Sequence, residues 1–399
     1  MKKLKAYKYR LRPTVEQERK LLQHGGSCRF LWNNLLADNQ QYYKSTGKFK
    51  FYHEMATSLP QLKQQHTFLT DVFSQSAQQV CRHLDRALKD SFKQQDKGFP
   101  NFKSKHKFSD SWTIPQKYRL AKHFVFIPKI GEVKWIRHRM YQGNVKHITI
   151  SQEGSQWYCS VTCEIDMNIP RKQDKNVVGI DLGLRSFVML SDGTSVPSPK
   201  CFNKSQDKLA KLQRQHAKKQ KRSKNKLKLT KKIQDCHRHI RNQRKDFLHK
   251  LSHDMITKYD GFCLEDLSVK SLLKDRSVAK SISDASWSDF SRQLEYKSDW
   301  YGKHYVEIDR YFPSTKTCSE CGNIQYVERS AKVYKCKNCS LLIDRDLNAS
   351  LNIKSEGLKK LNISKNTRGH LGINACGDDV RLISNNKQLS MNQEKCPLL

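Results

Sequence analysis

The stretch NVVGIDLGLRSFVMLSDG, residues 176–193, decides the fold class of this chain. Its apolar run at 177–180 is typical of a buried strand, and the run at 187–190 predicts a second strand that pairs with it. A turn signal, Asp-Gly, follows the second strand. The first strand ends at Asp181, where a carboxylate contributes nothing to packing, so Asp181 is a candidate for chemistry.

A second short buried strand follows a long helical region. Residues 204–259 have helical periodicity, and the apolar run at 262–264 then ends at Glu265. A strand, a helix and a strand in this order form a crossover unit, which favours parallel neighbours in one sheet. A further helix and a strand at 305–308 continue the pattern. We therefore expect Asp181 and Glu265 at the same rim of one α/β sheet.

Four cysteines beyond this sheet are spaced as a metal clip, C-x2-C-x14-C-x2-C. They are Cys318, Cys321, Cys336 and Cys339. Each pair can present two thiolates to one ion, and the longer interval suits a β-hairpin that returns to it. Four thiolates close a tetrahedral zinc shell, so this Zn²⁺ is expected to be structural; redox cysteines or an iron–sulfur cluster are the alternatives. Gly322 permits the tight turn of the first knuckle. The second knuckle has Ser340 there, which leaves the shape of that turn open but not the ligand set.

A third acid follows the clip. Asp346 begins DLNASLNIKS, which predicts a helix, and Asp344 competes with it for any role. Taken singly, Asp181 is also explained as a turn cap and Asp346 as a helix cap. Three carboxylates at one rim would repel one another strongly unless divalent cations lay between them, and oxygen ligands suit Mg²⁺ or Mn²⁺. Asp181, Glu265 and Asp346 together predict a site with two ions that activates water against a phosphodiester.

The N-terminal half divides into β-rich and helical parts. Residues 3–11 predict a strand, residues 15–95 have helical periodicity, and residues 110–166 contain short β-rich runs separated by turn residues. We interpret the β-rich part as a small barrel or curled sheet with which the N-terminal strand pairs. The helical block is then an insertion into a β domain.

The charge of the chain indicates its partner. Lysine and arginine number 75 against 38 acidic residues, and the formal net charge is +37. Such an excess would repel itself without a polyanion, so nucleic acid is the expected partner. Seven of the twelve residues at 221–232 are basic, which predicts a helical hairpin that faces nucleic acid, although a solvated hairpin would look alike.

The same composition addresses the compartment. No apolar segment follows MKKLKAYKYRLRP, so we expect neither a secretory signal nor a membrane span. The chain has 13 cysteines, and those outside the clip are scattered in apolar contexts. This pattern indicates a reducing compartment and one metal site, not a disulfide framework.

Several motifs, in their order along the chain, resemble one known family. VVGIDLG (177–183), GFCLEDLS (261–268) and the cysteine-rich stretch that ends in DRDLNAS (344–350) resemble the RuvC-like nuclease of transposon-encoded TnpB (OrfB) proteins. RNQRKDFLHKLSHDMI, RQLEYKSDWYG and GHLGINACGDDVR also look like that family. The resemblance covers most of the chain and is specific from about residue 170 onward. In the N-terminal half it rests on layout and on KAYKYRLRPTVEQERKLL.

The resemblance implies an activity and its residues. TnpB proteins are RNA-guided DNA endonucleases related to type V CRISPR effectors. They bind a guide RNA from the transposon end, recognise a short motif beside double-stranded target DNA and cut with one RuvC site. By motif, Asp181 matches the first catalytic acid and Glu265 the second. Asp346 matches the third, because the family's acid stands directly before x-Asn. We expect a monomer bound to RNA in the cytoplasm of a bacterium or archaeon.

The implied fold class is a multidomain α+β protein. It combines an RNase-H-like (RuvC) α/β nuclease, interrupted by a zinc ribbon, with a β-barrel wedge domain that carries a helical insertion. The expected domains are a wedge-like β domain at 1–13 and 105–172, a helical recognition-lobe insertion at 14–104, the nuclease at 173–313 with its basic hairpin at 204–259, the zinc ribbon at 314–340, the nuclease end at 341–356 and a flexible basic tail at 357–399.

Two other functions stay open. An RNase-H-like DNA transposase would transfer strands without RNA, but a cysteine clip just before the third acid fits it less well. A zinc-ribbon DNA-binding regulator that does not cleave, RNA-guided or not, would have no need of three acids at strand and helix ends.

Overall fold

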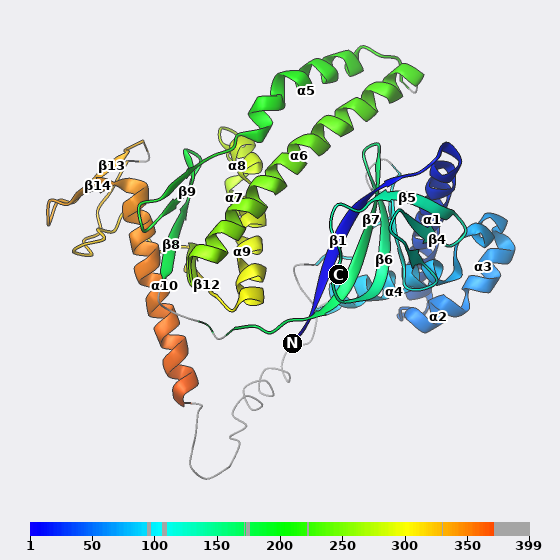
Figure 1. Cartoon of the computed structure of the whole chain (residues 1–399), viewed down its shortest axis with the longest axis horizontal. Helices are drawn as coiled ribbons and strands as arrows, with labels where there is room; N and C mark the ends of the chain where they lie inside the picture. Colours follow the sequence, from blue (N-terminus) through cyan, green and yellow to red (C-terminus); the bar gives the residue numbers. More distant parts are fainter. Residues whose placement is uncertain are drawn as a thin grey trace, which may run out of the picture. The chain divides into compact units, whose positions relative to one another are not determined.

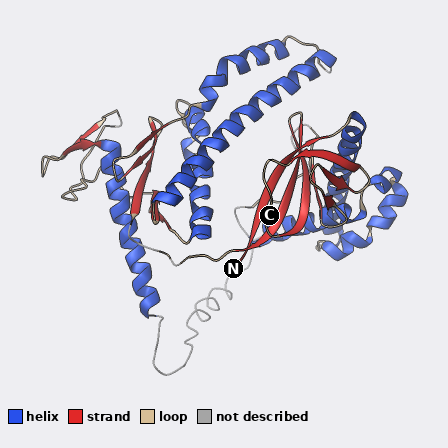
Figure 2. Cartoon of the chain, viewed as in Figure 1, coloured by secondary structure: helices blue, strands red, loops and turns tan. Residues whose placement is uncertain are grey.

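The computed structural model describes residues 1–93, 97–105, 110–170, 172, 176–221, 223–328 and 330–370, without the side chains of Lys204, Lys270 and residues 362–370. The chain divides into two units, residues 1–170 with 200–247 and residues 171–199 with 248–399. Each unit contains one large β-sheet and helices of its own (Figures 1 and 2).

A seven-stranded antiparallel sheet forms the frame of the first unit. Its order is β2-β6-β7-β1-β5-β4-β3. The strands are β1 (Lys2–Arg12), β2 (Ser111–Ile114), β3 (Arg119–Leu120), β4 (Phe124–Ile127), β5 (Gly131–Ile136), β6 (Asn144–Glu153) and β7 (Gln156–Asp166). The N-terminal strand lies between β7 and β5, which confirms its predicted pairing with the β-rich part. The order ends at β2 and β3, so the described strands form a curled sheet with two edges and not a hydrogen-bonded closed barrel (Figure 1).

Helices of the first unit pack on this sheet. They are α1 (Val15–Thr46), α2 (Tyr52–Thr57), α3 (Leu59–Gln65), the 3-10 turn η1 (Thr67–Asp71) and α4 (Ser74–Lys93). Thr14 begins α1 with a capping box in which its side chain and that of Gln17 each accept the other's backbone N–H. A single hydrophobic core continues from Trp157 of the sheet to Leu35 and Leu84 of the helices. The helical block therefore shares its core with the sheet.

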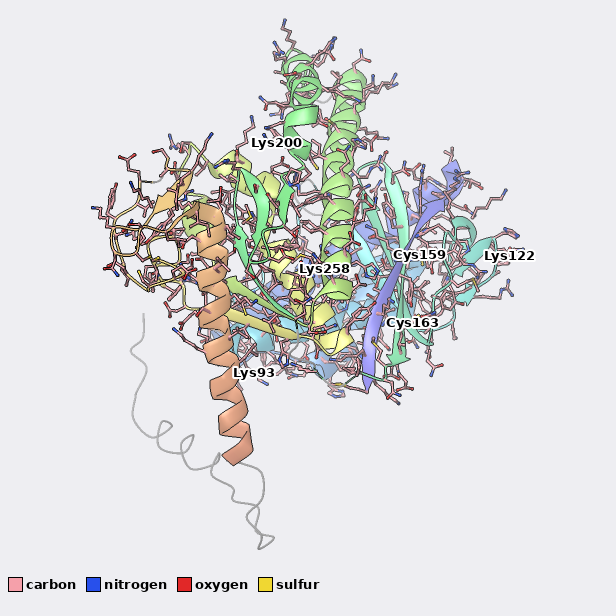
Figure 3. All side chains as sticks on the ribbon, turned by 60° about the vertical axis from the view of Figure 1, so that its left-hand side comes forward. Lys93, Lys122, Cys159, Cys163, Lys200 and Lys258 are labelled. Carbon is pink, nitrogen blue, oxygen red and sulfur yellow. The ribbon has the colours of Figure 1, made fainter. Side chains whose placement is uncertain are left out.

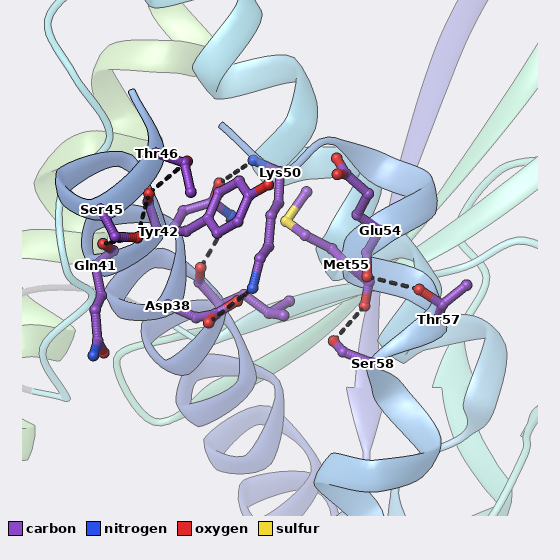
Figure 4. Close-up of polar contacts among 12 residues, drawn as sticks. Asp38, Gln41, Tyr42, Ser45, Thr46, Lys50, Glu54, Met55, Thr57 and Ser58 are labelled. Atoms are coloured by element: carbon purple, nitrogen blue, oxygen red, sulfur yellow. Dashed lines mark hydrogen bonds and ion pairs between the residues drawn. The ribbon is translucent and has the colours of Figure 1, made fainter. Parts of the chain in front are cut away.

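The connection between α1 and α2 is fixed by polar contacts (Figure 4). Helix α1 ends at Gly47, whose φ of 69° is the left-handed conformation that glycine adopts readily. Lys50 pairs with Asp38 at 2.9 Å, and its backbone N–H donates to Asn39 at 2.8 Å (Figure 4). Gly47 therefore breaks the helical region that the sequence predicts as one block, and the ion pair holds the turn.

The predicted basic hairpin is present as α5 (Cys201–Ala217) and α6 (Lys224–Lys258). Ser223 accepts a hydrogen bond from the N–H of Lys226 at the turn, and His216 contacts Thr230 across the hairpin at 3.0 Å. A small apolar seam of Cys201, Leu209, Cys236 and Ile240 joins the two helices. Lys200, before α5, and Lys258, the last residue of α6, mark in Figure 3 the ends of the two helices away from the connecting turn. None of the helices in the described part of the chain is long and apolar enough to cross a membrane.

The second unit is built on a five-stranded sheet in the order β10-β9-β8-β11-β12. The strands are β8 (Val177–Leu182), β9 (Ser186–Leu190), β10 (Ser195–Pro197), β11 (Gly261–Glu265) and β12 (His304–Ile308). Strand β11 is parallel to both β8 and β12, whereas β9 is antiparallel to β8. The parallel crossover and the antiparallel pair predicted from the sequence are both confirmed.

Four helices accompany this sheet: α7 (Val269–Leu272), α8 (Ala279–Ala285), α9 (Trp287–Tyr301) and α10 (Arg345–His370). Helix α10 lies along the sheet, beside β8 and β9 in Figure 1. Val177, Cys263 and Ile308 of the strands form one core cluster with Ile353 and Leu361 of α10. Side chains alternate along a strand, so every second residue counted from Val177 on β8 and from Cys263 on β11 faces this helix.

Helix α10 approaches the sheet so closely that glycine is required on each side of the contact. A Cβ atom on Gly179 of β8 would lie 2.6 Å from the backbone nitrogen of Lys354 and closer still to the carbonyl oxygen of Ser350. On Gly357 of α10 it would lie 2.6 Å from the Cβ of Cys263. Asp181, two residues after Gly179, therefore faces the beginning of the helix.

Residues 357–361 correct one predicted boundary. The polar composition predicts a flexible tail from residue 357, but Gly357 packs against Cys263 and Leu361 is buried in the core beside the sheet. The neighbouring residues are mostly polar, so the sequence pattern does not indicate that this part of the chain packs against the sheet. Residues 371–399, the rest of the predicted tail, lie outside the described residues.

We predict that Gly357→Ala destabilises the second unit, although alanine is the better helix former. The added methyl would overlap Cys263, at a cost of about 1–3 kcal/mol for overpacking. Thermal unfolding followed by circular dichroism measures the effect as a lower melting temperature.

Gly26→Ala is the matched control, because Gly26 is also inside a helix and the nearest atom to an added Cβ is 3.6 Å away. It should raise stability by about 0.5–1 kcal/mol. Equal shifts for the two variants would show that the close contact of α10 is not a constraint.

Candidate active site and metal centre

Asp181 and Glu265 occupy equivalent positions near the carboxyl ends of the neighbouring strands β8 and β11. The register of the parallel pair β8 and β11 places Ile180 opposite Leu264, and the two acids are the next residues of their strands. Both side chains are half-buried. The strand register thus brings these two carboxylates to one rim, where the sequence analysis expected them.

Asp346 reaches this rim from α10. The strand β14 (Leu342–Asp344) leads into the helix, and Asp344 accepts hydrogen bonds from the N–H groups of Asp346 and Leu347 at 2.9 and 3.2 Å. Asp344 is therefore the helix cap, with one oxygen committed to the backbone. Asp346 lies in the first turn, and its carboxylate contacts the guanidinium of Arg345 at 3.3 Å.

The three acids form one electrostatic cluster. Burial and the charges of Glu265 and Asp346 together raise the pKa of Asp181 to about 8, against the lowering effect of Arg345. Burial also raises the pKa of Glu265, and a hydrogen bond from Ser314 partly offsets that rise. A carboxyl group with a pKa near 8 keeps its proton at neutral pH unless a cation replaces that proton.

The chemistry of this donor set fits divalent cations. Carboxylate oxygens are hard ligands of the kind that Mg²⁺ and Mn²⁺ take, and mutual repulsion is relieved when a cation lies between them. The acids are not drawn together as the cysteines are: among the described residues, only the four cysteines have all their ligand atoms within 4.8 Å of one another.

The four cysteines form a compact cluster that suits one ion. The Sγ atoms of Cys318 and Cys339 lie 3.6 Å apart, as do those of Cys321 and Cys336. Each Cys-x-x-Cys pair occupies the tip of its own short hairpin, one closed by the bridge of Thr317 to Ile324 and the other by β13 (Val333–Lys335) with β14. The single returning hairpin expected between the pairs is thus replaced by two, because each knuckle forms its own local ladder.

The two knuckles have the same backbone turn despite their different residues. Gly322 has a φ of 74°, and Ser340 has a φ of 59° at the equivalent place. The side chain of Asn338 and the backbone of Asn323 lower the pKa of Cys321 to about 6 through hydrogen bonds. Ser340 therefore keeps the turn that Gly322 forms in the first knuckle, and Cys321 is available as a thiolate at neutral pH.

The other cysteines of the described residues take no part in this cluster. Cys159 and Cys163, labelled on β7 in Figure 3, are buried in the core of the first unit. Burial raises the pKa of Cys159 to about 12, which keeps this thiol neutral and unreactive.

Two asparagines tie the clip to α10, and the sequence analysis missed both. The side-chain N–H of Asn348 donates to the carbonyl of Thr317 at 2.7 Å, and its oxygen accepts from the N–H of Ser319 at 3.0 Å. Asn352 donates to the carbonyls of Thr317 and Ser314 at 2.7 and 2.8 Å. The signal in the sequence was an asparagine pair four residues apart, one helical turn, directly after the third acid.

Exposed lysines surround the turn of the α5–α6 hairpin. They include Lys218, Lys219, Lys221, Lys224, Lys228, Lys231 and Lys232. Figure 3 shows side chains projecting along this hairpin. A dense set of exposed ammonium groups of one sign is the electrostatic footprint of a surface that binds nucleic acid.

The fold and the site define a mixed α/β protein with a carboxylate cluster and a separate four-cysteine cluster. Family models match three segments. The model described as "Probable transposase" (OrfB_IS605) matches residues 160–276, and the model described as "Cas12f1-like, TNB domain" matches residues 287–353. A "Helix-turn-helix domain" model matches residues 1–48, where the structure has the strand β1 and the single helix α1.

One relative extends the match over most of the chain. A protein of Streptomyces pristinaespiralis named "Putative RNA-guided DNA endonuclease" is 32% identical over 385 residues, which cover 94% of this chain and 92% of the relative. "TnpB-like protein L770" of Acanthamoeba polyphaga mimivirus is 32% identical over 53% of this chain and 44% of its own. The chain belongs to the TnpB (OrfB) family.

A solved complex of Cas12f1 with single guide RNA and target DNA is also similar. Its protein is 17% identical, with a TM-score of 0.34 over 88% of this chain and 99% of that one.

We predict that Cys318→Ser removes the ion of the four-cysteine cluster. A serine oxygen replaces one thiolate of a closed shell, so the content of tightly bound metal should fall from about one ion per chain to near zero. Elemental analysis of the purified full-length protein measures this, and the melting temperature should fall with it.

Cys236→Ala is the control, because Cys236 is a buried thiol outside the cluster. Its metal content should equal that of the unchanged protein. An unchanged metal content in Cys318→Ser would contradict the four-thiolate site.

Proposed function

We propose that this protein is the RNA-guided DNA endonuclease of a transposable element. It hydrolyses phosphodiester bonds in target DNA beside a short motif, directed by a guide RNA from the transposon end. The observation that carries the proposal is the convergence of Asp181, Glu265 and Asp346 at one rim of the five-stranded sheet. Membership of the TnpB family supports the RNA guide and the DNA target.

In this proposal the five-stranded sheet and α10 form the RuvC-like nuclease. Asp181, Glu265 and Asp346 would hold Mg²⁺ or Mn²⁺, which when bound activates water and stabilises the leaving oxygen of a phosphodiester. The strand register fixes the positions of Asp181 and Glu265, and the capped first turn of α10 fixes the position of Asp346. Arg345, beside Asp346, adds positive charge where the anionic backbone of DNA would enter.

The four cysteines would hold Zn²⁺ in a structural role. A shell of four thiolates leaves no coordination position for substrate, so this ion would not act on DNA directly. Its contribution would be to fix the two hairpin tips and, through Asn348 and Asn352, the start of α10. This arrangement supports a ribbon that stabilises the nuclease.

The remaining parts would bind nucleic acid. The net charge of +37 and the exposed lysines of α5 and α6 support binding of the RNA–DNA duplex through its backbone, not its sequence. The curled sheet would act as the wedge-like domain, and the helices α1 to α4 as the recognition lobe. We propose that the complex contains one protein chain with its RNA.

We predict that cleavage requires both the guide RNA and Asp181. The protein, co-expressed with its transposon-end RNA, is incubated with a plasmid library that carries the target beside randomised flanks and with Mg²⁺. The wild type should cleave plasmids with one flanking motif. Asp181→Ala should cut less than about one thousandth as fast, because the metal site loses its first ligand.

RNA bound to the purified Asp181→Ala protein is the control for folding and should match the wild type. Cleavage or strand transfer without RNA would favour a transposase, and binding to DNA without any cleavage by the wild type would favour a regulator. Either result overturns the proposed function.

We predict that Asp344 and Asp346 have different roles, the first as a helix cap and the second as a metal ligand. Asp344→Asn should retain cleavage within about threefold, because asparagine caps a helix about as well as aspartate. Asp346→Asn should lose it, because an amide cannot replace an anionic ligand. Cleavage rates of the two RNA-bound variants decide between them, and the reverse pattern would assign the third catalytic acid to Asp344.

A further inference from the structure

Ser314 makes a direct contact with the second acid of the site. Its hydroxyl donates a hydrogen bond to Oε1 of Glu265. Ser314 is only 4% exposed and lies on the segment between β12 and the first cysteine of the clip. The contact joins two parts that are far apart in sequence, and neither the motifs nor the family match assigns a role to this serine.

The position of Ser314 is itself fixed by α10. Its carbonyl accepts from Asn352, and three residues later the carbonyl of Thr317 accepts from both Asn348 and Asn352. The two asparagines are 0% and 5% exposed, so water competes little for these bonds. We call residues 314–317 the strap. The strap is attached to the same helix whose first turn carries Asp346.

A strand register alone does not orient Glu265. Register fixes the Cα atom, but a glutamate has three rotatable bonds beyond it, and its carboxylate faces the repulsion of Asp181. The Ser314 hydroxyl fixes Oε1, so Oε2 stays available to a cation. Carboxylates that ligate metals are commonly held in this way by a hydrogen-bond donor behind them.

We propose that Ser314 is a positioning residue for Glu265, and that through the strap α10 sets the second and third acids together. The proposal rests on the proposed function, because it assumes that Glu265 is a metal ligand. Asn352 holds the backbone of Ser314 by a hydrogen bond, and the Ser314 hydroxyl holds the Glu265 carboxylate. Asp346 belongs to the same helix as Asn352. A shift of α10 would therefore move both acids.

The test compares Ser314→Ala with Ser314→Thr in the RNA-bound full-length protein. Alanine removes the donor, and threonine keeps the hydroxyl. The first readout is Mn²⁺ affinity without DNA, measured by isothermal titration calorimetry after removal of other divalent ions. The second is the single-turnover cleavage rate at rising Mg²⁺ concentration, and the third is the affinity for target DNA.

Ser314→Ala should weaken Mn²⁺ affinity and lower the cleavage rate by about 10- to 100-fold, the usual effect of losing a partner of a metal ligand. Its affinity for DNA should stay within about twofold of the wild type, because Ser314 is buried. Ser314→Thr should restore most of the metal affinity and the rate. A merely structural role would lower stability without moving metal affinity.

Ser350→Ala is the matched control, because Ser350 is a buried serine on α10 whose hydroxyl bonds only within its own helix in the described structure. It should have the metal affinity and rate of the wild type. If Ser314→Ala does not fold, Ser314→Cys, similar in size to serine but a weak donor, should show the same loss of metal affinity.

Wild-type metal affinity and rate in folded Ser314→Ala, or in Ser314→Cys, would overturn the proposal. Glu265→Gln separates this failure from a failure of the proposed function. If Glu265→Gln abolishes cleavage while Ser314→Ala is unaffected, only the positioning role is wrong. If Glu265→Gln cleaves normally, Glu265 is not a ligand and the proposed site is wrong as well.

Discussion

The contact of α10 with the backbone of β8 and β11 is the constraint on which the second unit depends. Gly179 and Gly357 allow it, because each occupies a place where a Cβ would overlap the other element. At these two positions no Cβ atom holds the helix away from the sheet. Asp181 is two residues from Gly179 on the same face, so the beginning of the helix meets that acid. The third carboxylate reaches the rim by helix packing, whereas the first two reach it by strand register.

Charge acts on two scales in this molecule. Over the chain, the excess of 75 basic over 38 acidic residues favours binding to a polyanion. At the rim, burial and neighbouring carboxylates raise the pKa of Asp181 to about 8, so the site is short of positive charge. Arg345 meets only part of that need. A protein that attracts phosphates broadly but concentrates acids at one point is suited to bringing divalent cations between those acids and a phosphate.

The sequence predicted the parts of the site that depend on local pattern. Apolar runs located the strands that carry Asp181 and Glu265, and cysteine spacing located the four-cysteine clip. It did not predict contacts that form only in the folded chain. Asn348 and Asn352 donate to backbone carbonyls, which have no signature in residue type, and the Ser314 hydroxyl reaches Glu265 across 49 residues of sequence. The separate hairpins of the two knuckles and the length of α10 also depend on tertiary packing. The assignment of Asp181, Glu265 and Asp346 to catalysis, and the division into wedge-like and recognition domains, stay predictions.

The clip lies directly before α10, where it can protect the position of Asp346 against a shift of the helix. A one-residue slip of a buried strand turns its whole apolar face outward, so Asp181 and Glu265 are protected by the cost of such a slip. A helix has no two-residue alternation to protect its register, and a shift of one residue would rotate its side chains by about 100°. Asp346 would then miss the rim. The four-cysteine clip immediately before the helix, joined to it by Asn348, removes that freedom by fixing where the helix begins.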